Sequence, residues 1–128
     1  MRWLVFALGG HNVRLTDSSA ETLERAPSLM AGALQTLTEA GEADASWNGQ
    51  RLSRAVRCEA SLDETVAGAA LVIEAIIERP DAKRTLYAAL EPLLAPDAIL
   101  ASNTSNLDIF PLVPDGLQAR AIIAHWYT

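Results

Sequence analysis

Four places in the sequence carry side chains that could bind a ligand or move a proton, and each follows a short apolar run. They are Asp17, Glu78, the Asn-Thr-Ser segment at 103–105, and His125. A carboxylate accepts hydrogen bonds from hydroxyl groups, Asn and Ser bind polar ligands, and a neutral imidazole accepts a proton near neutral pH. In an open α/β sheet, ligands bind outside the carboxyl ends of the strands. We therefore expect these side chains to line one rim of a sheet.

Each of these side chains also has an explanation that involves no ligand. Asp17 could cap the following helix as readily as it could bind a ribose. Glu78 and Lys83 could form a solvated ion pair, which is the favoured interpretation of that pair taken alone. The 103–105 segment could cap the next short helix, and a histidine at a strand end is often only hydrogen-bonded. Four such groups on one rim are harder to explain without a ligand.

The elements that would position these side chains alternate between strands and helices. We expect strands at residues 11–17, 55–59, 71–77, 98–101 and 119–125. We expect helical segments at residues 2–8, 18–41, 61–68, 80–95 and 108–113. Pro27 predicts a kink or break in the second of these helices, and residues 43–50 are predicted to form a polar loop. The alternation favours an α/β fold with a mainly parallel sheet, in which the apolar run 71–77 is buried on both faces.

The composition excludes several classes of function. The net charge is -6 and the ten basic residues are scattered, so a nucleic-acid partner is not expected. No apolar run approaches the ~20 residues of a membrane-spanning helix, and residues 1–13 lack a signal-peptide cleavage pattern, so we expect a cytoplasmic protein. Cys58 is the single cysteine, which excludes an internal disulfide and a cysteine-based metal site. We expect Cys58 to pack in the core and predict no metal site.

Three motifs follow one another in the second half of the chain. They are Leu-Val-Ile-Glu-Ala-Ile-Ile-Glu at 71–78 followed by Lys83, Ile-Leu-Ala-Ser-Asn-Thr-Ser at 99–105, and His-Trp-Tyr at 125–127. Together they resemble the NAD-binding domain of the 3-hydroxyacyl-CoA dehydrogenase family, and residues 6–17 are similar to that family's first helix and second strand. The Ala-Ser-Asn-Thr-Ser block with the downstream histidine is the most specific part. The resemblance implies a Rossmann-like α/β fold, with flanking helices around a mainly parallel sheet.

This resemblance implies NAD as the cofactor. The residues implied to bind it are Asp17, Ala75, Glu78, Lys83, Asn103 and Ser105. A carboxylate at Asp17 would bind the ribose hydroxyls of the adenosine and would repel the additional phosphate of NADP. Glu78 and Lys83 would line the cofactor groove beside Ala75, and Asn103 would lie near the nicotinamide.

The resemblance also implies a catalytic pair. His125 would be the general base that takes the proton of the substrate's 3-hydroxyl while hydride passes to the nicotinamide. Ser105 would hydrogen-bond the 3-oxygen. The implied reaction oxidises a 3-hydroxyacyl-CoA, or a related 3-hydroxy acid, to the 3-oxo compound, as in fatty acid β-oxidation. The implied partners are this small-molecule substrate and, for intact family members, a second copy in a homodimer; neither nucleic acid nor a membrane is implied.

The sequence departs from the family's pattern at both ends. The family's first strand and its Gly-x-Gly-x-x-Gly turn, which brings backbone to the pyrophosphate, would precede Met1. The family's Asn after two aromatic residues is Thr128 here, and a C-terminal helical domain would follow it. We therefore expect residues 1–128 to be a partial NAD-binding domain, a fragment that is inactive alone. The alternative is a non-catalytic remnant that acts as a binding or interaction module; a receiver-like module is disfavoured, since only Asp17 is a suitably placed acid.

The family's strand order places the missing strand between the strand that ends at Asp17 and the strand at 71–77. Those two strands should therefore either pair directly or leave a gapped sheet. Unpaired backbone groups at such edges lower stability and favour association through them.

Overall fold

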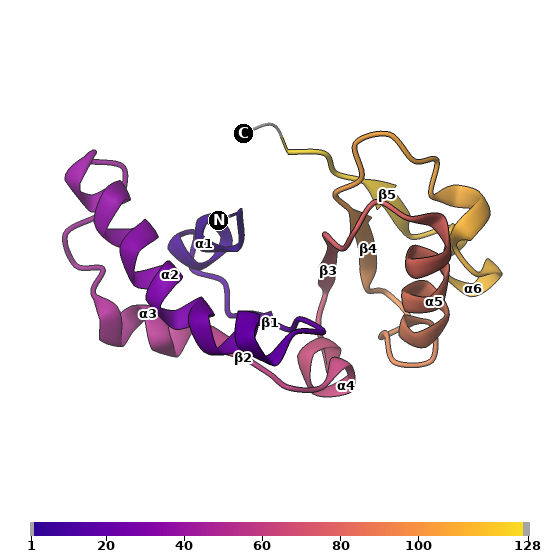
Figure 1. Cartoon of the computed structure of the whole chain (residues 1–128), viewed down its shortest axis with the longest axis horizontal. Coiled ribbons are helices and arrows are strands. Elements are labelled where there is room, and N and C mark those ends of the chain that lie inside the picture. The colour runs from indigo at the N-terminus through magenta and orange to yellow at the C-terminus, as the bar shows by residue number, and fades with distance from the viewer. Residues whose placement is uncertain (1, 127–128) are drawn as a thin grey trace. The chain divides into compact units, whose positions relative to one another are not determined.

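The computed structural model describes residues 2–126, and it comprises two compact units, Met1–Thr65 and Val66–Thr128 (Figure 1). The described strands are β1 (Val13–Leu15) and β2 (Val56–Cys58) in the first unit, and β3 (Leu71–Glu74), β4 (Ile99–Ser102) and β5 (Ala121–Ile123) in the second. The second sheet has the order β3-β4-β5. Every described strand pair is parallel, which confirms the predicted α/β class with parallel pairing.

The strands β1 and β3 belong to two separate sheets. In the described chain β1 pairs with β2 and β3 pairs with β4, so each has a hydrogen-bonded neighbour along one edge.

Three of the described helices lie wholly in the first unit: α1 (Arg2–Leu8), α2 (Ala20–Glu39) and α3 (Gly49–Ala55). A fourth, α4 (Leu62–Val66), crosses the boundary of this unit with the second unit at Thr65. Helix α1 ends at Leu8, directly before two glycines, of which Gly10 has a φ of +90°, a conformation that glycine adopts without strain. Helix α4 begins after Ser61, whose hydroxyl donates to the Glu64 carboxylate at 2.8 Å.

Helix α2 runs without interruption through Pro27, so the break considered from the sequence is not found. Proline removes one N–H from the helical ladder and crowds the preceding turn. The turns after it carry Met30, Ala33 and Leu34, which are buried in the core of the first unit. Burial of that apolar face stabilises the helix beyond the proline, and this tertiary contribution is not visible in a local pattern.

The predicted polar loop at residues 43–50 is confirmed through Asn48, and helix α3 then occupies residues 49–55, where the sequence predicted no helix. Its N-cap is Asn48, whose Oδ1 accepts a hydrogen bond from the backbone N–H of Arg51 at 3.0 Å. An Asn followed by Gly is typical of a turn, but an Asn side chain that can close a turn can equally cap a helix.

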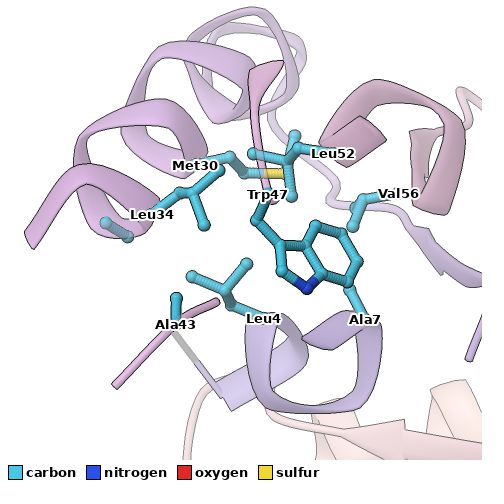
Figure 2. Close-up of a cluster of buried hydrophobic side chains, with 9 residues drawn as sticks. Leu4, Ala7, Met30, Leu34, Ala43, Trp47, Leu52 and Val56 are labelled. Carbon is cyan, nitrogen blue, oxygen red and sulfur yellow. The ribbon is translucent and has the colours of Figure 1, made fainter. Parts of the chain in front are cut away.

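The core of the first unit is built around Trp47, which is 8% exposed (Figure 2). The buried residues that cluster with it are Leu4, Ala7, Met30, Ala33, Leu34, Ala43, Leu52 and Val56. They come from helices α1, α2 and α3, from strand β2 and from the loop before Trp47. Cys58 is partly buried against this cluster, as expected, and burial raises the pKa of its thiol.

The second unit adds helices α5 (Pro80–Leu90) and α6 (Asp115–Gln118) and a short 3-10 turn, η1 (Phe110–Leu112). Helix α5 starts at Pro80 as predicted. Strand β3, however, ends at Glu74, and Ile76 and Ile77 are 40% and 65% exposed, so the prediction of a strand buried through residue 77 is wrong. The Glu74 carboxylate accepts the N–H of Ile76 at 2.7 Å, which uses a backbone group that would otherwise extend the ladder.

Candidate active site at the carboxyl ends of β3, β4 and β5

The three strands of the second unit end in register. Glu74 of β3 pairs with Ser102 of β4, and Ser102 pairs with Ile123 of β5. The next backbone groups continue this alignment, because the N–H of Asn103 donates to the carbonyl of Glu74 at 2.8 Å and the N–H of Ala124 donates to that of Ser102 at 2.9 Å. The segments that carry Glu78, Asn103–Ser105 and His125 therefore leave the sheet at the same rim, as the sequence predicted.

Ser105 and His125 meet at this rim. The Ser105 Oγ lies 2.9 Å from the His125 Nε2, and Ser105 is exposed while His125 is half-buried. The Oδ1 of Asn103 accepts the N–H of Trp126 at 3.1 Å, which ties the end of β4 to the segment after β5. A hydroxyl and an imidazole in this geometry can exchange a proton with each other or with a polar group placed beside both.

The same pair could in principle act as a nucleophile and its base. Acyl transfer would also need N–H donors for a developing oxyanion. The N–H groups of Ser105 and Asn106 both donate to Glu78 Oε1, at 2.8 and 3.0 Å, so a carboxylate occupies those donors. This arrangement favours proton transfer over acyl transfer.

Glu78 holds the loop that carries Ser105. Its Oε1 also accepts the hydroxyl of Thr104 at 2.5 Å, in addition to the two backbone N–H groups. Hydrogen bonds from Thr104 and from the N–H groups of Asn106 and Ser105 lower the pKa of Glu78 to about 2. The carboxylate is therefore ionised throughout the neutral range and fixes the loop after β4 to the segment after β3.

A buried ion pair lies beneath this loop. Lys83 of α5 places its Nζ 2.8 and 2.9 Å from the two carboxylate oxygens of Glu74, and both side chains are at most 1% exposed. Glu74 also accepts the hydroxyls of Tyr87 at 2.7 Å and Ser102 at 2.6 Å. Burial alone would raise the pKa of Glu74, but these hydrogen bonds outweigh it and the pKa is lowered.

The sequence suggested a solvated ion pair between Glu78 and Lys83. The ion pair is present, but Lys83 is not solvated. The Nζ of Lys83 does lie 3.3 Å from Glu78 Oε2, but the ammonium is buried and its shortest contacts are to Glu74. The sequence analysis did not single out Glu74 or its partners Tyr87 and Ser102. A glutamate inside the apolar run 71–77 was the available signal, since a buried carboxylate requires partners that satisfy it.

Asp17 belongs to the first unit. It is exposed two residues beyond the end of β1, and its Oδ1 accepts the N–H of Ser19 at 2.9 Å. Ser19, rather than Asp17, is the N-cap of α2. The cap interpretation of Asp17 is therefore wrong, and the bond from Ser19 uses one of the about four acceptor positions of its carboxylate.

Ala75 follows β3 directly and is exposed, as a position lining a groove would be. Among residues 2–126 no group of three or more metal-ligating side chains comes together, and no helix is long and apolar enough to cross a bilayer.

The sequence match identifies the family. The family model for the 3-hydroxyacyl-CoA dehydrogenase NAD binding domain matches residues 3–128. The chain belongs to this family. The predicted resemblance is confirmed, and NAD, the expected cofactor, is the one that the family's description states.

Relatives in this family include a 3-hydroxybutyryl-CoA dehydrogenase from Bradyrhizobium diazoefficiens, which is 35% identical over 105 residues. That match covers 82% of this chain and 35% of the relative. An L-carnitine dehydrogenase/betainyl-CoA thioesterase from Agrobacterium fabrum is 30% identical over 125 residues, which cover 96% of this chain and 25% of the relative.

The crystal structure of 3-hydroxybutyryl-CoA dehydrogenase from Escherichia coli superposes with a TM-score of 0.82 at 30% identity. The superposition covers 96% of this chain and 26% of that one, and it confirms the Rossmann-like fold. The chain thus spans well under two thirds of the length of each of these three proteins.

Proposed function

We propose that this chain supplies the NAD-binding part and the catalytic base of an enzyme that oxidises the 3-hydroxyl of a 3-hydroxyacyl-CoA, or of a related 3-hydroxy acid, to the 3-oxo compound. The observation that carries the proposal is the 2.9 Å contact between Ser105 Oγ and His125 Nε2 in a chain of this family. In the proposed reaction His125 takes the proton of the substrate hydroxyl. Ser105 hydrogen-bonds the same oxygen and keeps it beside the imidazole.

NAD, when bound, accepts the hydride that leaves carbon 3. In the first unit the exposed carboxylate of Asp17 fits a ribose, because it retains acceptor capacity for two hydroxyl groups beyond its bond to Ser19. In the second unit Ala75, Glu78 and Asn103 stand at the rim where we propose that the cofactor groove runs. Lys83 belongs to this groove by position, although its ammonium is turned inward toward Glu74.

The substrate class is a 3-hydroxy compound that carries either a CoA ester or a free acid. The relatives are described as acting on both kinds, since one is a 3-hydroxybutyryl-CoA dehydrogenase and another an L-carnitine dehydrogenase. We further propose that the whole enzyme works as a homodimer in the cytoplasm. The 128-residue chain contains no Gly-x-Gly-x-x-Gly sequence, and we propose that it is inactive by itself.

A chimera tests the proposal. The chain's matching segment replaces that of the Bradyrhizobium 3-hydroxybutyryl-CoA dehydrogenase, and NADH formation is followed with 3-hydroxybutyryl-CoA and with L-carnitine. The proposal expects NADH from at least the CoA ester. A folded chimera that forms none, beside an active parent enzyme, would favour a non-catalytic binding module instead.

A further inference from the structure

Lys83 is the least accessible of the residues that the sequence assigned to the cofactor groove. It is 1% exposed, and its Nζ lies within 3.3 Å of three carboxylate oxygens, two from Glu74 and one from Glu78. An ammonium buried among carboxylates is costly to move, because separating the charges leaves each of them unsatisfied. Lys83 therefore acts within the protein, through the groups it touches.

Glu74 fixes the place of that ammonium. Its side chain is fully buried, and its carboxylate accepts hydrogen bonds from four groups: the ammonium of Lys83, the hydroxyls of Tyr87 and Ser102, and the N–H of Ile76. These donors come from α5, from β4 and from the segment after β3. Neither the carboxylate nor the ammonium can shift without breaking several of these bonds.

Glu78 connects this buried pair to the loop. Its Oε2 faces Lys83, while its Oε1 accepts the N–H groups of Ser105 and Asn106 and the hydroxyl of Thr104. The two oxygens of the Glu78 carboxylate thus contact different partners. The Lys83 ammonium orients the carboxylate through Oε2, and Oε1 holds the loop that carries Ser105.

We propose that Lys83 and Glu78 are positioning residues, in which Lys83, fixed by Glu74, orients Glu78 so that Glu78 holds the loop backbone and sets the Ser105 hydroxyl against His125. The role of this arrangement in catalysis rests on the proposed function. The arrangement itself depends only on the contacts within the second unit. If the buried pair served only to stabilise the core, changing it would lower stability and leave the geometry of the loop unchanged.

Nuclear magnetic resonance of the 128-residue chain distinguishes these two roles. The double variant Glu74→Gln/Lys83→Met removes both buried charges together and keeps the side-chain volumes similar. We expect the amide protons of Ser105 and Asn106 to shift upfield and to exchange about tenfold faster than in the unmodified chain. The Nε2 resonance of His125 should move toward its position in Ser105→Ala.

Two further variants keep the test decisive. Glu78→Gln alters only the partly exposed carboxylate, so it should fold even if the double variant does not, and it should give the same changes at Ser105 and His125. Glu91→Gln is the matched control, since Glu91 Oε1 accepts the N–H of Gly116 at 3.1 Å in the same unit but away from the loop, and it should leave those resonances in place.

The proposal is overturned if folded Glu78→Gln or the folded double variant keeps the Ser105, Asn106 and His125 resonances of the unmodified chain. It is also overturned if the unmodified chain shows no protection at those two amides. Failure of the proposed function has a different signature: the resonances would respond as expected, but the chimera would form no NADH.

Discussion

Ser105 Oγ and His125 Nε2 lie 2.9 Å apart, although 20 residues separate them in the chain. Parallel pairing of β4 with β5 aligns their carboxyl ends, and the loop after β4 then carries the serine toward the histidine. The contact is therefore a consequence of sheet register together with a loop held by Glu78.

Substitution of the serine tests its part in this contact. In the active chimera, Ser105→Ala should lower kcat by about 10- to 100-fold, because the substrate oxygen loses a hydrogen bond that keeps it beside the base. Initial-rate kinetics measure the effect. Ser53→Ala, which changes an exposed serine bonded only to the carbonyl of Gln50, is the control and should leave kcat unchanged.

The buried pair should respond asymmetrically to single substitutions. Lys83→Met leaves Glu74 without its counter-ion and should cost about 3–5 kcal/mol of unfolding free energy. Glu74→Gln should cost less, since Lys83 keeps its contact with Glu78 at 3.3 Å.

The double variant Glu74→Gln/Lys83→Met should lie within about 1–2 kcal/mol of the unmodified chain, because no buried charge is left unpaired. Urea denaturation of the four proteins measures these differences. Costs that simply add in the double variant would contradict the pairing.

Stability should depend on pH through Glu78. Its pKa in the folded chain is about 2, below the ordinary value of 4.5, so the ionised carboxylate stabilises the fold above about pH 4.5. This contribution should be lost progressively as the pH falls from about 4.5 toward about 2. The melting temperature of Glu78→Gln should therefore fall less steeply than that of the unmodified chain below about pH 4.5, whereas Glu91→Gln should follow the unmodified chain.

The sequence predicted the rim of polar side chains better than it predicted the elements beneath it. Glu78 and His125 were recognised because short apolar runs precede them, and the resemblance supplied their roles. Asp17, which was expected on the same sheet, follows β1 in the other sheet. Glu74 was overlooked because it was counted within an apolar run, and its partners Tyr87 and Ser102 lie 13 and 28 residues away in sequence. Such a network depends on packing of α5 against β3 and β4, which no local pattern reports.

The break considered at Pro27 and the extension of the polar loop to residues 49 and 50 were wrong for related reasons. The continuity of α2 through Pro27 depends on burial of the following turns, and the start of α3 depends on how the Asn48 side chain is used. At Pro27 the low helix propensity of proline was overridden by packing of the following turns. At Asn48 the local sequence did not distinguish a loop from a helix cap, and tertiary contacts determined the outcome.

Binding of NAD should depend on backbone that the sequence does not contain. The 128-residue chain lacks a Gly-x-Gly-x-x-Gly turn, so calorimetry should detect weak binding or none. A chimera that carries such a turn should bind NAD, and Asp17→Ala should then weaken binding by about tenfold. Tight binding by the 128-residue chain, unaffected by Asp17→Ala, would show that the cofactor is held in another way.

The most direct test of the whole account is the rate of NADH formation by the chimera with His125 changed to Gln. Base catalysis of this kind contributes roughly 10²–10⁴-fold, so His125→Gln should lower kcat with 3-hydroxybutyryl-CoA by about that factor while the dissociation constant of NAD stays nearly unchanged. A His125→Gln chimera that forms NADH at the unmodified rate would contradict the assignment of His125 as the base, and with it the proposed function of this chain.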